Sequence, residues 1–183
     1  MISLAGLKSM LCACNISIVS RYLTITPDQI IEDLYKEIER RECGLCLTSD
    51  GLKRLVVKCY GEIHDSLGRG LETLETHRLY PNGESRHTQY QRIGGKKLLT
   101  EEPIVALHRM LTDKFPFWAL DVWHIGEHRI ELEEDIDCRI YPGLPSFYTR
   151  YIFHVQLKPG LQIQDIYEGK RENCTEKHTF TWK

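Results

Sequence analysis

Hydrophobic residues recur at helical spacing in the segment that starts at Thr26. Thr26 is a typical N-cap, Pro27 suits the first helical position, and Gln29 completes a capping box. Apolar side chains then follow at the spacing of one helix face, at Ile30, Ile31, Leu34 and Ile38. The pattern predicts a helix over 27–42.

A second stretch with helical spacing begins at Thr100, the expected N-cap. Glu101 and Glu102 place negative charge near the positive end of this helix, which stabilises it. Its inward-facing apolar positions are Ile104, Leu107 and Leu111. Pro116 marks the end of the predicted helix.

Alternation of apolar and polar residues predicts β-strands in most of the remaining chain. Asp50-Gly51 is a turn signal and predicts a hairpin whose second limb spans 52–63; that limb also fits a helical stripe, but its β-branched residues favour a strand. A second, polar hairpin over 71–93 folds at 81–83, and we expect it to project from the core. Further strands are predicted at 117–124, 128–133, 135–141 and 147–157, with turns at Gly126 and 142–143 and a tail from 159 onward.

The N-terminal segment is less regular: residues 2–13 fit a short helix or part of a strand, and 16–25 alternates as a strand. The order of strand, helix, strands, helix and strands predicts the α+β class, a mainly antiparallel sheet with two helices on one face. We expect a ferredoxin-like core with an added C-terminal β-meander, in a single domain over 1–183.

Composition excludes several classes of protein. Of the 183 residues, 42% are hydrophobic and 27% charged, as in globular domains, and the net charge of -2 argues against binding of polyanions by the whole surface. Seven scattered cysteines, an odd number, predict a reducing, cytoplasmic environment. No segment has membrane-spanning length, so we expect no membrane partner. No phosphate loop, dinucleotide fingerprint, nucleophile elbow or kinase motif is present.

One cysteine cluster has spacing close to that of a small zinc finger. Its members are Cys43, Cys46, Cys59 and His64. In a strand, Cys59 and His64 would point to opposite faces, so the predicted strand over 52–63 counts against this site, and buried thiols are the alternative. We expect no cofactor, and zinc or another divalent metal is the alternative that these residues leave open.

Residues 77–97 form a basic segment within a chain that is net negative. Its side chains of interest are Arg78, Arg86, His87, Tyr90, Arg92, Lys96 and Lys97, against the single acid Glu84. A basic β-ribbon of this kind can lie along a nucleic-acid backbone or dock on an acidic protein surface. The alternative is a hairpin whose charge only keeps it soluble.

An acidic block of six carboxylates and Arg129 lies at 127–137. It would complement the basic segment within the molecule or across a homodimer. Folding the chain about Gly126 would also bring Asp121 opposite Glu131, and His124 opposite His128. That arrangement predicts a divalent-metal site for phosphodiester chemistry, with His124 as general acid or base. The alternative is a polar face whose acids Arg129 neutralises.

The sequence alone favours a binding or regulatory protein that engages another macromolecule, protein or nucleic acid, through the basic hairpin and the acidic strands. Two rival hypotheses stay open. One is a metal-dependent enzyme acting on phosphodiesters, and the other is a zinc-stabilised nucleic-acid-binding module.

Overall fold

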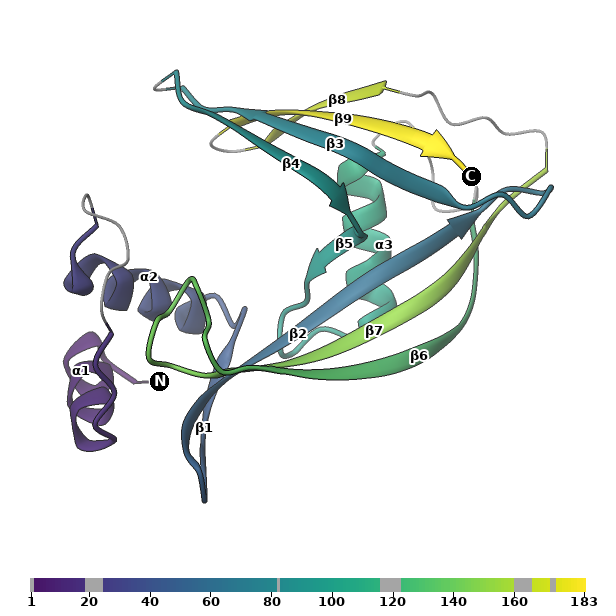
Figure 1. Ribbon diagram of the computed structural model, residues 1–183. Coiled ribbons are helices and arrows are strands. Elements are labelled where there is room, and N and C mark those ends of the chain that lie inside the picture. Colours follow the sequence, from purple (N-terminus) through teal and green to yellow (C-terminus); the bar gives the residue numbers. More distant parts are fainter. Residues whose placement is uncertain (1, 19–24, 82, 116–122, 160–165, 172–173) are drawn as a thin grey trace. The chain divides into compact units, whose positions relative to one another are not determined.

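The computed structural model describes residues 2–18, 25–81, 83–115, 123–159, 166–171 and 174–183 (Figure 1). The helices in this part of the chain are α1 (Leu4–Ala13), α2 (Pro27–Glu39) and α3 (Pro103–Lys114). The strands are β1 (Gly44–Thr48), β2 (Gly51–His64), β3 (Leu71–Leu79), β4 (Ser85–Gln91), β5 (Ile93–Lys96), β6 (Trp123–Asp135), β7 (Ser146–Leu157), β8 (Ile166–Arg171) and β9 (Cys174–Trp182).

The chain divides into two compact units. Unit 1 contains Met1–Lys58, Lys96–Glu101 and Ile130–Arg150, and unit 2 contains Cys59–Gly95, Glu102–Arg129 and Tyr151–Lys183. Strands β2, β6 and β7 contribute residues to both units, and each unit has its own cluster of buried apolar side chains. That the chain is one domain remains a prediction.

The described strands form two sheets, where the sequence predicted one. Sheet A has the order β1-β2-β7-β6, with β5 also paired to β2, and sheet B has the order β4-β3-β9-β8. The pairs β1 with β2, β3 with β4, β3 with β9 and β8 with β9 are antiparallel. The α+β class with mainly antiparallel pairing is therefore confirmed. The finer expectation of a ferredoxin-like core stays a prediction.

Both predicted helices form, and one of the two predicted caps is correct. The Thr26 hydroxyl accepts a hydrogen bond from the Gln29 amide at 3.3 Å, and the Gln29 side chain accepts one from the Thr26 amide at 2.8 Å. Helix α2 ends at Glu39, three residues earlier than predicted. The N-cap of α3 is Glu102, which makes no side-chain capping bond, so the prediction of Thr100 as the cap is wrong.

The first predicted hairpin is confirmed, with its turn one residue earlier than expected. Thr48 pairs with Gly51, so the two-residue turn is formed by 49 and 50. The second limb is strand β2, as the β-branched residues indicated. Buried and half-buried side chains alternate over its first half, with Leu52, Arg54 and Val56 on the buried side.

The second hairpin forms between β3 and β4 but does not project from the core. Strand β3 also pairs with β9, so it lies inside sheet B with a neighbour on each side. Thr73 and Thr76 on β3 are buried. The prediction failed because β8 and β9 come from the segment after 159, which the sequence pattern left as a tail.

The predicted turn at Gly126 is wrong. Strand β6 runs through Gly126 without interruption from Trp123 to Asp135. A single glycine between strand-forming residues is compatible with a continuous strand. A side chain at Gly126 would first meet the carbonyl oxygen of His154 at 3.6 Å, an ordinary contact, so the position does not demand glycine.

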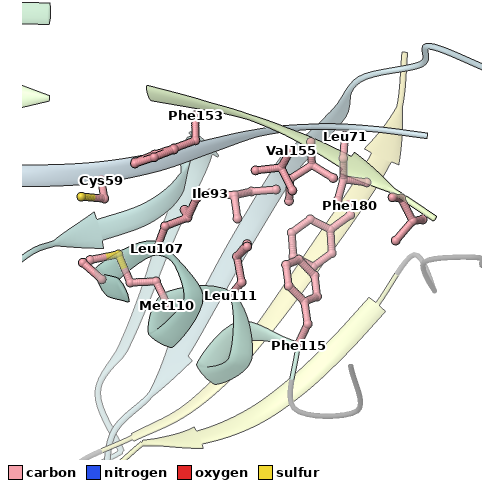
Figure 2. Close-up of a cluster of buried hydrophobic side chains, with 13 residues drawn as sticks. Cys59, Leu71, Ile93, Leu107, Met110, Leu111, Phe115, Phe153, Val155 and Phe180 are labelled. Carbon is pink, nitrogen blue, oxygen red and sulfur yellow. The ribbon is translucent and has the colours of Figure 1, made fainter. Parts of the chain in front are cut away.

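The core of unit 2 forms where α3 contributes its apolar face to strand residues from β2, β3, β5, β7 and β9 (Figure 2). Leu107 and Leu111 of α3 lie among these side chains, and the rings of Phe115 and Phe180 lie 5.2 Å apart. At Gly94 the chain approaches β2 so closely that an added Cβ would lie 2.0 Å from the carbonyl oxygen of Cys59. With a φ of +150°, this position requires glycine.

A buried arginine organises the core of unit 1. Arg54 is fully buried, and its guanidinium lies 4.7 Å from the ring centroid of Tyr141. It forms an ion pair with Glu37 of α2 and donates a hydrogen bond to Ser146 at 3.4 Å. Lys96 of β5 pairs with the other oxygen of Glu37. Burial alone would raise the pKa of Glu37, but Lys96 and Arg54 lower it below the ordinary value of 4.5.

We predict that Arg54→Met destabilises the protein by about 3–5 kcal/mol. The substitution removes one of the two cations that pair with Glu37, whose carboxylate is largely buried. The adjacent Lys53→Met is the matched control. Lys53 pairs with Glu134 at 2.7 Å near the surface, and its loss should cost about 1 kcal/mol or less. Urea unfolding of the two variants measures both values, and similar losses would contradict a special role for Arg54.

The lowered pKa of Glu37 also predicts how stability depends on pH. The ionised carboxylate contributes stability above about pH 4.5, and the contribution is lost as the pH falls through the lower pKa of the folded state. Glu37→Gln should therefore be less stable than the wild type at neutral pH, with a difference that shrinks in acid. Urea unfolding at a series of pH values tests this, and a difference that does not vary with pH would argue against it.

Candidate functional site

Unit 2 contains a cleft of about 530 Å³. It lies among the end of β2, the start of β3, the residues that open β5, and parts of β7 and the C-terminal segment. The lining residues are Tyr60, Gly61, Glu62, Ile63, His64, Gly70, Leu71, Glu72, Thr73, Arg92, Ile93, Ile152 and Lys183. Clefts of this volume accommodate small organic ligands.

The buried apolar lining of the cleft consists of Ile63, Leu71, Ile93 and Ile152. These residues come from four strands, and each belongs to a region where alternate side chains turn toward a buried face. The half-buried Tyr60 and the exposed Arg92 bring polar groups to the same cleft, and the guanidinium of Arg92 lies 5.7 Å from the Tyr60 ring centroid. The cleft thus combines an apolar surface with a small number of polar groups.

Thr73 is the polar group in the cleft that packing leaves least satisfied. A register shift between Thr73 and Glu75 in the pairing with β9 accompanies the burial of both Thr73 and Thr76. The hydroxyl of Thr76 lies 3.0 Å from Nδ1 of His178, whereas Thr73 Oγ1 has no hydrogen-bond partner in the part of the chain that the structure describes. A buried hydroxyl without a partner costs about 1–3 kcal/mol. Thr73 is therefore a candidate contact for a ligand.

The carboxylates at the cleft already have cationic partners. Arg129 donates to both oxygens of Glu62, at 2.7 and 2.5 Å, and this pairing lowers the pKa of Glu62. Lys183 pairs with Glu72 at 2.5 Å. A paired carboxylate with a lowered pKa stays ionised at neutral pH and is a weak general acid or base.

The loop between β2 and β3 is held in place by its own hydrogen bonds. Asp65 accepts bonds from the backbone amides of Leu67 and Arg69, each at 2.9 Å, and from Arg69 Nε at 2.7 Å. Burial would raise the pKa of Asp65, but these bonds from Arg69 and Leu67 lower it. Gly70 and Lys183 exchange two backbone hydrogen bonds of 2.9 Å. This edge of the cleft is therefore preformed.

The four residues of the predicted zinc site are divided between the two units. Cys43 lies in the buried cluster of unit 1 and Cys59 in that of unit 2, while His64 stacks on His154 with ring centroids 4.7 Å apart. Burial raises the pKa of Cys43 to about 11, which keeps it a neutral thiol, whereas zinc binds the thiolate. Across the described residues, no group of three or more His, Cys, Asp or Glu side chains is placed to hold a metal.

The basic segment is also divided by the fold. Lys97 is buried, and its Nζ donates to the backbone carbonyl of Leu98 at 2.7 Å. Lys96 is engaged by Glu37, and Arg92 lies at the cleft. Neither lysine thus belongs to an open binding surface. Arg78, Arg86, His87 and Tyr90 remain on the strands of the β3–β4 hairpin, and their binding of a macromolecule stays a prediction.

The turn at Gly126 that would build the predicted phosphodiester site is absent from the continuous strand β6. Asp121 lies outside the described residues. His124 and His128 are four residues apart on the continuous strand β6, a separation of about 13 Å, so they do not face one another. Glu131 lies on the same strand and is half-buried.

The acidic block finds partners outside the basic segment. Arg129, expected to neutralise its own block, pairs with Glu62. Glu133 pairs with Arg150, and Glu134 pairs with Lys53. These ion pairs do not support the expected complementation with residues 77–97.

Sequence reasoning did not find the cleft. Its residues are spread over five segments between 60 and 183, so no local spacing could reveal it. The sequence pattern places Tyr60 in a predicted strand and His64 in a cysteine motif, and it connects neither residue with a cleft. The one signal in the sequence is that Thr73 places a hydroxyl two positions after the apolar Leu71, on the same face of the predicted strand.

Comparisons with known proteins leave the function open. No family model and no curated protein matches the chain. Among solved structures, the chain is similar to the solution structure of the E. coli ORF135 protein at 15% sequence identity, over 70% of this chain and 72% of that one, with a TM-score of 0.37. A likeness this distant supports no statement about function. No helix in the described part of the chain is long and apolar enough to cross a membrane.

Proposed function

We propose that this protein binds a small molecule in the cleft of unit 2. The observation that carries the proposal is the combination of a cleft of about 530 Å³ with the buried hydroxyl of Thr73 in its lining, which has no hydrogen-bond partner among the described residues. An apolar lining favours the body of a ligand, and a few fixed polar groups give it orientation. A ligand with a hydrogen-bonding atom would satisfy Thr73 and remove the cost of its burial.

The ligand chemistry follows from the lining. The apolar lining favours a ligand whose main part is apolar and flat or compact, because the lining side chains offer no hydrogen bonds. These side chains are Ile63, Leu71, Ile93 and Ile152. Arg92 and Tyr60 favour a polar or anionic group at one end, since a guanidinium donates to such groups. Cationic ligands are disfavoured because Glu62 and Glu72 already pair with Arg129 and Lys183.

Binding is favoured over catalysis by the same contacts. Glu62 is bound by Arg129 through both oxygens, so it is poorly suited to transfer protons during a reaction. The proposal keeps the binding or regulatory class that the sequence favours and replaces the macromolecular partner with a small molecule as the first candidate.

The first test uses two identical substitutions on one strand. Thr73→Val removes a hydroxyl that has no hydrogen-bond partner in the described ranges, so it should leave stability unchanged or slightly raised. Thr76→Val removes the hydroxyl that lies 3.0 Å from Nδ1 of the buried His178, and it should cost about 1–3 kcal/mol. Thermal unfolding of both variants tests the contrast. Equal destabilisation would show that the Thr73 hydroxyl is already satisfied within the protein and would remove the main support for the proposal.

The second test blocks the cleft. Gly70 lines the cleft and does not have a left-handed φ. A Cβ added there would meet only the His64 ring, at 3.9 Å, so we expect Gly70→Phe to fold. The anionic apolar dye anilinonaphthalene sulfonate serves as the first probe, followed by a thermal-shift screen of small metabolites. We expect Gly70→Phe to abolish binding and Thr73→Val to weaken that of a hydrogen-bonding ligand about tenfold. Wild-type affinity in a folded Gly70→Phe protein would refute the site.

A further inference from the structure

Two histidines face each other across the β3–β4 hairpin. The antiparallel register pairs His77 directly with His87. Their rings are stacked, with centroids 4.1 Å apart and an angle of 19° between the ring planes. His87 is exposed and His77 is half-buried, so solvent reaches the pair. This pair lies apart from the cleft residues and has no role in the proposed function.

The fold fixes this pair more firmly than a loop would. Directly opposed positions on antiparallel strands place two Cβ atoms about 4.5–5.5 Å apart on the same face. Strand β3 is itself held on its other side by β9, where Lys177 is the partner of His77. The two imidazoles are therefore presented together by strands whose spacing is set by the sheet.

We propose that His77 and His87 jointly bind one divalent transition-metal ion, with water completing its coordination. Each neutral imidazole offers one nitrogen lone pair, and imidazole is a preferred ligand of copper, nickel and zinc. The lone pairs of stacked imidazoles lie in nearly parallel planes, so the side chains must rotate to turn them toward one ion at a metal–nitrogen distance of about 2.0–2.1 Å. Affinity should be highest for Cu²⁺, as is general for nitrogen ligands among these ions.

The surroundings select against other cations. Magnesium and calcium require oxygen ligands, and the pair supplies only nitrogen. A metal shared by β3 and β4 would tie the two strands of the hairpin together and would stabilise the folded state increasingly as the free metal concentration rises above its Kd.

The stacked pair of His64 and His154 provides an internal control. Its rings are farther apart, at 4.7 Å, and His64 lines the cleft. His128 is a second control, because its ring lies against Tyr151 and Phe153 and stacks on no histidine that the structure describes. Substitutions at His64 and His128 should leave metal binding by the hairpin unchanged.

The experiment titrates the full chain, without a histidine tag, with CuCl₂, NiCl₂ and ZnCl₂ by isothermal calorimetry. We expect one Cu²⁺ per chain at the hairpin, and a loss of affinity of at least about tenfold in His77→Gln and in His87→Gln. His64→Gln and His128→Gln should bind as the wild type does. Circular dichroism confirms that each variant is folded. Electron paramagnetic resonance of the copper complex should show two nitrogen ligands.

Three outcomes would overturn the proposal. The first is the absence of binding by the wild-type chain. The second is unchanged affinity in both hairpin variants. The third is a loss of binding in His64→Gln with the hairpin intact, which would assign the metal to the other histidine pair. Because none of these results involves Thr73 or Gly70, the proposal can fail without affecting the proposed cleft, and the reverse also holds.

Discussion

The organisation of unit 1 depends on the two ion pairs that the carboxylate of Glu37 forms. This carboxylate receives Arg54 of β2 on one oxygen and Lys96 of β5 on the other, so a single side chain of α2 joins a helix to two strands. A fully buried guanidinium is tolerated only with such a partner, because desolvation of an unpaired charge costs several kcal/mol. Tyr141 and Ser146 complete its surroundings. A packing of these elements that buried Arg54 away from Glu37 would leave the guanidinium without its counter-charge, so the pair disfavours such alternatives.

Local chemistry made part of the fold predictable. Thr26 and Gln29 satisfy each other's backbone groups, so the start of α2 could be read from four consecutive residues. The turn before Gly51 likewise depends on its immediate neighbours. The prediction of a turn at Gly126 was wrong because a single glycine is compatible with both a turn and a continuous strand. Only the pairing partners of β6 decide between the two. Strand β9 was missed because its pairing with β3 joins residues about a hundred positions apart.

The candidate site was less predictable than the fold, for a related reason. The charge pattern along the sequence grouped Lys96 and Lys97 with Arg78 and Arg92. In the fold, Lys96 forms an ion pair and Lys97 contacts a backbone carbonyl. Arg78 lies on the β3–β4 hairpin, and Arg92 lines the cleft. The pairing of His77 with His87 could have been derived from the hairpin turn alone, had the register been counted outward from it. The cleft could not have been derived in this way, because Thr73 and Lys183 line the same cavity only once sheet B has formed.

Gly94 has a consequence for how substitutions in this chain would be interpreted. Its missing side chain allows β5 to approach the Cys59 carbonyl, next to the Tyr60 and Ile93 that line the cleft. In a library of random mutants, this position would be as intolerant as the deepest core residue, although it has no side chain to contact anything. A survey that scored only loss of activity would therefore mark Gly94 as functional. Measuring the amount of folded protein in parallel would reveal that its requirement is geometric.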